Sequence, residues 1–128
     1  MPTAAATTPF EFARLRRALE RSEPDVLADL YSDDAEMVIV DRNRPPSAPM
    51  RLAGKPAIDA FWRDVCSREM THCVGHEVIG PDRTAFVEEC VYPDGCNVMS
   101  AMTLELRDGR IVRHLTVQAW DETNCSTG

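Results

Sequence analysis

The sequence predicts an α+β fold, in which helices gather on one face of an antiparallel sheet. In the first half of the chain, apolar residues recur at helical spacing, most clearly over residues 10–21 and 54–69. From residue 71 onward, four extended segments alternate with short turns rich in Gly, Pro and Asp, as in an antiparallel meander. The expected order is therefore helix, helix, strand, helix and then four strands.

Three helices are expected. The first covers residues 10–21, because its apolar side chains share one face while arginines occupy the other. The segment Ser22-Glu23-Pro24-Asp25 ends this helix and opens a short second one that reaches Tyr31. The third opens at a Gly-Lys-Pro sequence, covers residues 54–69 and buries a stripe that includes Trp62.

Five strands are expected. A turn at Asp33-Asp34 precedes the first strand, which covers residues 36–41. Residues 42–53 are expected to be irregular, because three prolines exclude regular pairing, and loops of this length often cover sites. The remaining strands cover residues 71–79, 83–92, 97–107 and 110–121, with Asp108-Gly109 as a two-residue hairpin turn.

Length and charge limit the classes of partner. The chain has 128 residues, which suits a single domain with a loose arm over residues 1–8 and a tail over residues 122–128. Its 14 basic and 21 acidic residues give a net charge of −7, which disfavours nucleic acid and anionic membranes as partners. No apolar run spans a bilayer and the first residues lack the pattern of a signal peptide, so we expect a cytoplasmic location.

The sequence contains no motif for a bound cofactor. We find no glycine-rich nucleotide loop, no Gly-x-Ser-x-Gly elbow and no Cys/His spacing typical of structural zinc, so neither cofactor nor metal is expected. The cysteines are expected to be free thiols, although Cys73 and Cys90 could meet across neighbouring strands. The five cysteines are Cys66, Cys73, Cys90, Cys96 and Cys125.

Ionisable side chains stand at the ends of three predicted strands, where a side chain often points into a cavity. Asp41 follows the apolar run Met37-Val38-Ile39-Val40, His72 opens the next strand, and Asp121 closes the last one. Carboxylates and imidazoles in such places can act as general acids or bases. His72 suits proton transfer because the unperturbed pKa of an imidazole is roughly 6.5.

Each of these candidates also has a structural alternative. Asp41 could be a turn carboxylate that pairs with Arg42 or Arg44, although the two arginines could also steer an anionic substrate. His72 could be a sheet histidine bonded to the backbone, and Asp121 could be a solvated residue of the acidic tail.

Two tryptophans could form the apolar walls of a ligand cavity. Trp62 lies on the stripe of the third helix and Trp120 lies near the end of the last strand, and ordinary core packing is the alternative for Trp62. Glu88 and Glu105 alternate with apolar neighbours and are expected to face solvent or a partner sheet.

Four short patterns, together with the order of elements, carry a resemblance to a known family. The chain resembles the cone-shaped, cystatin-like α+β barrel of the nuclear transport factor 2-like superfamily, over roughly residues 10–121. This superfamily includes ketosteroid isomerases, scytalone dehydratase, limonene epoxide hydrolase and SnoaL-like polyketide cyclases, and its fold hosts many functions. The patterns are Leu30-Tyr31-Ser32-Asp33-Asp34-Ala35, Gly54-Lys55-Pro56-Ala57-Ile58 with Phe61-Trp62, Thr71-His72, and Asp108-Gly109-Arg110-Ile111.

The resemblance implies roles for single residues. Asp41 falls near the general base of ketosteroid isomerases, His72 resembles a proton-transfer histidine of scytalone dehydratase, and Asp121 falls near an aspartate of SnoaL-like cyclases. The oxyanion-hole acid and the helix-one tyrosine of the isomerases would fall near Met102 and Leu15, which donate no hydrogen bond. This difference argues against ketosteroid isomerisation itself and leaves Met102, with Trp62 and Trp120, as an expected substrate contact.

Three hypotheses follow. The first is a cofactor-independent lyase, isomerase or cyclase for an apolar, carbonyl-bearing, polyketide- or steroid-like molecule, with Asp41 abstracting a proton, His72 donating to the oxygen and residues 42–53 as a lid. The second is a non-catalytic module that binds a small apolar ligand. The third is a dimerisation module, as the resemblance implies, and this role is compatible with either of the others. The open sheet face that would pack on a second copy is expected to carry Thr103, Glu105, His114 and Thr116.

Overall fold

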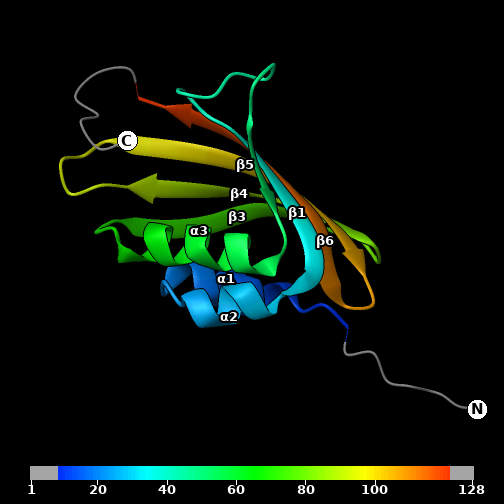
Figure 1. The fold of residues 1–128 in the computed structure, drawn as a ribbon. Helices are drawn as coiled ribbons and strands as arrows, with labels where there is room; N and C mark the ends of the chain where they lie inside the picture. The colour runs from blue at the N-terminus through cyan, green and yellow to red at the C-terminus, as the bar shows by residue number, and fades with distance from the viewer. Residues whose placement is uncertain (1–8, 122–128) are drawn as a thin grey trace, which may run out of the picture.

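A six-stranded curved sheet wraps over three helices in the structure, a computed structural model that describes residues 9–121 (Figure 1). The predicted α+β class is confirmed, and the sheet stays open rather than closing into a barrel. The predicted arm and tail lie outside the described residues. The helices are α1 (Phe12–Glu20), α2 (Pro24–Asp29) and α3 (Lys55–Ser67); the strands are β1 (Tyr31–Val40), β2 (Met50–Ala53), β3 (Thr71–Ile79), β4 (Arg83–Val91), β5 (Asn97–Arg107) and β6 (Arg110–Trp120).

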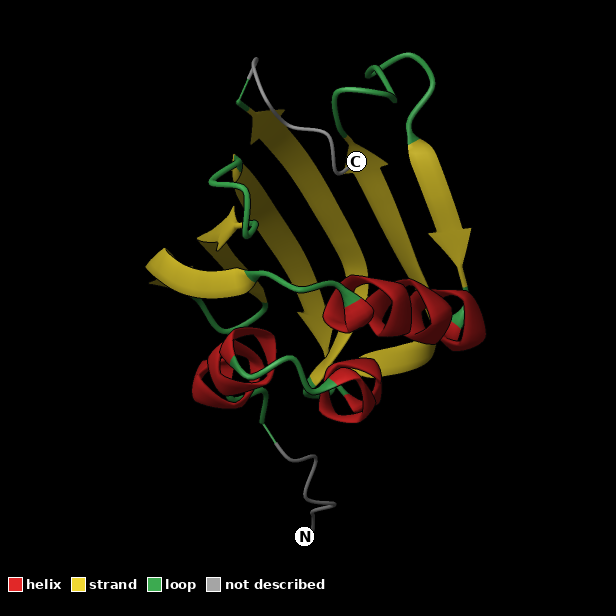
Figure 2. Ribbon diagram, turned by 90° about the vertical axis from the view of Figure 1, so that its left-hand side faces the viewer, coloured by secondary structure: helices red, strands yellow, loops and turns green. Residues whose placement is uncertain are grey.

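The strand order is β2-β1-β6-β5-β4-β3. All neighbours pair antiparallel except β1 and β6, which run parallel and join the first strand of the chain to the last. The three helices lie together on one face of the sheet (Figure 2). Among residues 9–121, none of these helices is long and apolar enough to cross a membrane.

Two predicted element boundaries are wrong. Tyr31 belongs to β1 rather than to the second helix, because it is fully buried and pairs with Ile111 of β6. The register of β1 against β6 shifts between Tyr31 and Glu36, so Asp33 and Asp34, expected to form a turn, lie exposed within the strand instead.

The second half of the predicted loop is also partly ordered. Residues 50–53 form the edge strand β2, which pairs antiparallel with β1. The three prolines of this region lie before the strand, where they remove no hydrogen bond from the ladder. Gly54, with a φ of 90°, then turns the chain into α3.

Side chains on the inner face of the sheet form rows that become more polar toward one end. The row at the apolar end holds Leu104, His114 and Met37, and the next row holds Met102, Thr116 and Ile39. In the third row Glu88, Ser100 and Gln118 face inward on β4, β5 and β6. The helices fill the apolar end with Leu15, Leu19, Ile58 and Trp62.

His114 and Thr116 therefore lie inside the fold, and their expected place on the open sheet face is wrong. Both are buried, because β6 presents alternate residues inward in register with Met37 and Ile39 of β1. The outer face instead exposes apolar side chains of β5 and β6, namely Met99, Leu115 and Val117.

A chain of hydrogen bonds crosses this core from α3 to β6. Trp62 Nε1 donates to the Tyr31 hydroxyl over 3.2 Å, and that hydroxyl lies 2.7 Å from His114 Nδ1. The other ring nitrogen, His114 Nε2, lies 2.9 Å from Thr116 Oγ1. The chain satisfies polar atoms that would otherwise be buried at a cost of about 1–3 kcal/mol each.

Burial fixes the protonation of the two central groups. Burial raises the pKa of Tyr31 far above its usual range, so its hydroxyl keeps its proton and can donate to His114. Burial also lowers the pKa of His114 to about 3, so the imidazole is neutral near neutral pH. Among the described residues His114 Nδ1 is the acceptor within reach of the buried Tyr31 hydroxyl, so the tyrosine proton goes to Nδ1, and Nε2 carries the imidazole proton.

The buried His114 makes stability depend on pH in a defined window. The folded pKa of about 3 lies below the ordinary value of 6.5, so the unfolded chain binds a proton first as the pH falls. The contribution of His114 is complete above pH 6.5 and is lost progressively toward pH 3. We expect the free energy of unfolding to fall by up to about 1.4 kcal/mol per pH unit from this group. Urea titrations of wild type and His114→Asn between these pH values measure it, and equal slopes would contradict the assignment.

The hydroxyl of Thr84 is buried at the apolar end without a hydrogen-bond partner among the described residues. Replacement by Val keeps the shape and removes the desolvated polar group, so we expect Thr84→Val to stabilise the protein by about 1 kcal/mol. Chemical denaturation measures the change. Thr103→Val, the same substitution at an exposed position of β5, is the matched control and should leave stability within about 0.5 kcal/mol.

Candidate functional site

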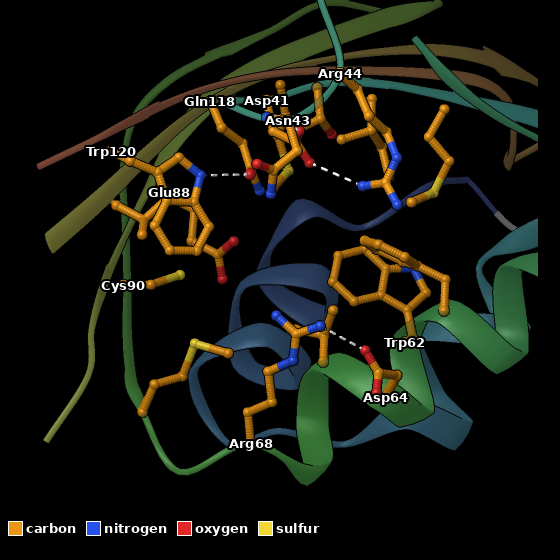
Figure 3. Close-up of a pocket in the computed structure, with 18 of the residues that line it drawn as sticks. Asp41, Asn43, Arg44, Trp62, Asp64, Arg68, Glu88, Cys90, Gln118 and Trp120 are labelled. Atoms are coloured by element: carbon orange, nitrogen blue, oxygen red, sulfur yellow. Dashed lines mark hydrogen bonds and ion pairs between the residues drawn. The ribbon is translucent and has the colours of Figure 1, made fainter. Parts of the chain in front are cut away.

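A cavity of about 270 Å³ lies at the polar end of the sheet (Figure 3). Its walls come from the end of β1 and the turn that follows, from α3, and from the inward faces of β4, β5 and β6. Phe61, Val65, Val98 and Met102 supply apolar surface, while Glu88, Thr116 and Gln118 supply polar groups. Charged side chains, namely Asp41, Arg44, Asp64 and Arg68, line it as well, so the wall combines apolar and polar surface.

Four of the six residues selected from the sequence line this cavity. They are Asp41, Trp62, Met102 and Trp120. Asp121 does not; it is exposed, and its Oδ2 accepts a hydrogen bond of 2.9 Å from the backbone N–H of Asn97. His72 lies behind the wall, against Glu88.

Asp41 is both a cavity residue and a turn carboxylate that pairs with Arg44. It lines the cavity, and it also closes a turn with Arg44 through two backbone hydrogen bonds. Its Oδ1 accepts a hydrogen bond of 2.9 Å from the Asn43 N–H, and its Oδ2 lies 3.1 Å from Arg44 Nη1. Both carboxylate oxygens therefore already hold the turn together.

Glu88 is the buried carboxylate of the cavity, and its expected solvent exposure is wrong. Only 4% of the residue is exposed, and it lines the cavity beside Cys90. Apolar residues occur at both parities of β4, since Phe86 and Cys90 alternate with Val87 and Val91. The pattern of apolar residues therefore does not show which face of β4 points inward. The one sequence signal is the large Phe86, which favours burial of its own face, and Glu88 lies on that face.

His72 and Glu88 form a buried pair. His72 Nδ1 lies 2.8 Å from Glu88 Oε2, and the two side chains are 2% and 5% exposed. The other ring nitrogen, Nε2, is buried and has no hydrogen-bond partner among the described residues. The imidazole thus orients the carboxylate from the side away from the cavity.

Cys90 lies beside this pair as a protonated thiol. Its Sγ is 3.3 Å from His72 Nδ1, and burial together with the negative charge of Glu88 raises the pKa of Cys90 well above its usual range. Cys66 is similar, since burial and Glu88 raise its pKa to about 11. Neither cysteine therefore has the thiolate character of a nucleophile.

The cysteine pairing differs in part from expectation. Cys66, Cys73 and Cys90 are free, so no disulfide joins Cys73 to Cys90. Cys96 is disulfide-bonded, so the expectation of a free thiol is wrong there, and Cys125 lies outside the described residues.

The residues that could hold a metal ion are His72, Glu88 and Cys90. One ligand atom from each lies within 4.8 Å of the others. The 2.8 Å between Nδ1 and Oε2 is shorter than the roughly 3.3 Å between two such ligands on tetrahedral zinc. An ion would have to open the His72–Glu88 hydrogen bond and remove the Cys90 proton.

Arginines surround the mouth of the cavity, each near a carboxylate or a ring. Arg44 pairs with Asp41, and Arg68 Nη2 lies 2.6 Å from Asp64 (Figure 3). The guanidinium of Arg42 lies over the ring of Trp120, 4.2 Å from its centroid. The sequence-based alternatives of charge balance and steering both fit this arrangement, since the paired arginines stand at the entrance.

Comparisons with known proteins identify the fold and the family. An NTF2-like protein of unknown function from Mesorhizobium loti has a similar structure, with a TM-score of 0.75 and 18% identity over 84% of this chain and 87% of that chain. A provisionally assigned ketosteroid isomerase from Kribbella flavida gives 0.71 and 15%, over 91% and 79%. A Silicibacter pomeroyi protein with a cystatin-like fold gives 0.63 and 14%, over 84% and 72%.

These identities are low, so the structural likeness shows the fold alone. No curated protein sequence matches this chain significantly. The model of the SnoaL-like domain matches residues 12–114, from the start of α1 to His114 in β6, which is most of the described chain. The chain therefore belongs to the SnoaL-like domain family, and its fold is similar to that of the NTF2-like protein from Mesorhizobium loti.

Proposed function

We propose that this protein is a small acid–base enzyme that moves a proton on an apolar, carbonyl-bearing molecule, with Glu88 as the base. The observation that supports the proposal is the placement of Glu88, a buried carboxylate on the wall of a cavity that Trp62, Trp120 and other apolar side chains also line. A carboxylate in such a place is shielded from water and close to any bound substrate.

Glu88 suits this role better than Asp41. The Asp41 carboxylate is paired with the permanently charged guanidinium of Arg44 and its side chain is 13% exposed, whereas the Glu88 side chain is 5% exposed. Glu88 receives hydrogen bonds from His72 and from the Cys90 thiol. Because a carboxylate has about four lone-pair positions, some remain free toward the cavity.

The proposed chemistry balances without an added group. Glu88 takes a proton from a carbon next to the substrate carbonyl, which leaves an enolate and a neutral carboxyl group. The same carboxyl then returns the proton to another carbon, or to a leaving hydroxyl, as in isomerases and lyases. His72 acts as a positioning residue that keeps the carboxylate turned toward the cavity.

The cavity also limits the substrate. A volume of about 270 Å³ lies just below the usual range of ligand cavities, roughly 300–1,000 Å³, so a small molecule is expected. Trp62 and Trp120 provide flat apolar walls, which suit a cyclic or conjugated molecule. The provisional isomerase assignment of the Kribbella flavida structure is consistent with this chemistry, at the level of fold.

Substitution of Glu88 tests the proposal directly. We expect Glu88→Gln to lower the rate of α-proton exchange in D₂O on a panel of cyclic ketones and enones by about 10²–10⁴-fold. Proton NMR of the ketones measures this rate without knowledge of the final product. Glu89→Gln is the matched control, because Glu89 is the next residue of β4 and is exposed on the opposite face.

Asp41→Asn should keep the exchange rate within about tenfold, since Asn can still accept hydrogen bonds in the turn. Full activity in Glu88→Gln together with loss of activity in Asp41→Asn would assign the role of general base to Asp41 instead. Binding of the ketones without any exchange by wild type would favour the non-catalytic ligand-binding module instead.

The positioning role of His72 makes a separate prediction. The amide N–H of Asn can occupy the place of Nδ1, so we expect His72→Asn to keep more activity than His72→Leu, by about tenfold. Turnover and KM for both variants measure the difference, with circular dichroism as the check on folding. Equal losses in the two variants would contradict a role through the hydrogen bond to Glu88.

A further inference from the structure

We infer that Thr116 and Gln118 of β6 form a subsite for a hydrogen-bond acceptor oxygen of the ligand. This inference rests on the proposed function for its role in catalysis, but it concerns binding and can be tested separately. Both residues line the cavity, and both lie on the inward face of β6 at positions i and i+2.

Thr116 has a hydroxyl proton to donate into the cavity. The directed chain from Trp62 through Tyr31 makes His114 Nε2 a donor, and its N–H points to Thr116 Oγ1 at 2.9 Å. The opposite direction would leave the proton of the fully buried Tyr31 hydroxyl without an acceptor among the described residues. Thr116 Oγ1 therefore accepts from within the protein, and its own proton remains for a ligand.

Gln118 is oriented in the same way. Trp120 Nε1 donates to Gln118 Oε1 over 3.0 Å, which fixes the amide so that its NH₂ group is the part left for a ligand (Figure 3). Trp120 is itself held in place, with Tyr92 stacked at 5.9 Å between ring centroids and Arg42 on its face. In both side chains the oxygen accepts a hydrogen bond from within the protein, and the Thr116 hydroxyl proton and the Gln118 NH₂ group are left to donate to a ligand.

The donors lie across the sheet from the proposed base. Glu88 pairs with Ser100, and Ser100 pairs with Gln118, so base and donor occupy one row on strands two apart. Neighbouring strands are about 4.8 Å apart, which places their backbones roughly 10 Å from each other. A ring with a carbonyl substituent spans that gap, with its acidic C–H toward Glu88 and its oxygen toward β6.

The subsite supplies hydrogen-bond donors that the sequence lacks at the positions where ketosteroid isomerases have them. Leu15 and Met102 donate nothing, and β6 supplies two neutral donors instead. Neutral donors fixed in an apolar cavity stabilise a neutral carbonyl moderately and a developing enolate oxygen more strongly. The ligand class is thus a ketone, enone or similar acceptor.

A pair of isosteric probes tests the subsite. Acetophenone and α-methylstyrene have the same shape, but only acetophenone carries an acceptor oxygen. We expect wild type to bind acetophenone about tenfold or more tightly, and Thr116→Val to reduce that ratio about fivefold. Thr103→Val, the same change on the outer side of β5, should leave the ratio unchanged. Calorimetry or intrinsic tryptophan fluorescence gives both affinities.

Infrared spectroscopy of the bound ketone tests the orientation of Gln118. The carbonyl stretching frequency of bound acetophenone should lie below its value in hexane, and Gln118→Met should raise it. Trp120→Phe removes the donor that fixes the amide while keeping an aromatic wall, so it should raise the frequency as well.

Equal affinities for the two probes in wild type, failure of both to bind at millimolar concentration, or a frequency insensitive to Thr116→Val and Gln118→Met would overturn the subsite. These measurements need no turnover. Loss of probe discrimination with Glu88-dependent exchange intact refutes the subsite alone, whereas intact discrimination with full exchange in Glu88→Gln refutes the proposed base alone.

Discussion

The parallel pairing of β1 with β6 holds the functional end of the molecule together. It places Tyr31 beside Ile111, and it sets Met37 and Ile39 in register with His114 and Thr116. Every hydrogen bond between the N-terminal part of the core and β6 depends on that register. A shift by one residue would turn the inward side chains of β6 outward and separate Tyr31 from His114.

The same pairing gives the two sides of the cavity different chemistry. On β4, Glu88 offers carboxylate lone pairs, and His72 contacts it from behind the wall. On β6, the oxygens of Thr116 and Gln118 each accept a hydrogen bond from His114 or Trp120, which leaves the hydroxyl proton and the NH₂ group as donors. An acceptor wall facing a donor wall across an apolar space suits a molecule that loses a proton at one end while charge develops at the other.

Much of this arrangement follows from local sequence patterns. The helical stripes and the turn signals of residues 71–121 predicted α1, α3 and the meander, because these patterns are set by neighbours in sequence. Asp41, Trp62 and Trp120 were found as cavity residues because they lie at strand ends or on a helix stripe.

Other features depend on contacts between distant segments. The second helix was extended to Tyr31, since nothing local shows that Tyr31 pairs with Ile111. Glu88 was turned to solvent because both faces of β4 carry apolar residues. The donor character of Thr116 could not be predicted at all, because it is set by Trp62, which lies 54 positions earlier and acts through two other side chains.

The position of β6 in the middle of the sheet also has a consequence for how the chain folds. β1 joins the sheet through β6 and β2, and β6 is the last of the described strands to leave the ribosome. Tyr31, Met37 and Ile39 on the apolar face of β1 therefore stay uncovered until β6 has been synthesised. Closing so long a loop is entropically costly and slows folding. The cavity is thus assembled late, and a nascent chain that lacks β6 has neither its donor wall nor a buried core around Tyr31.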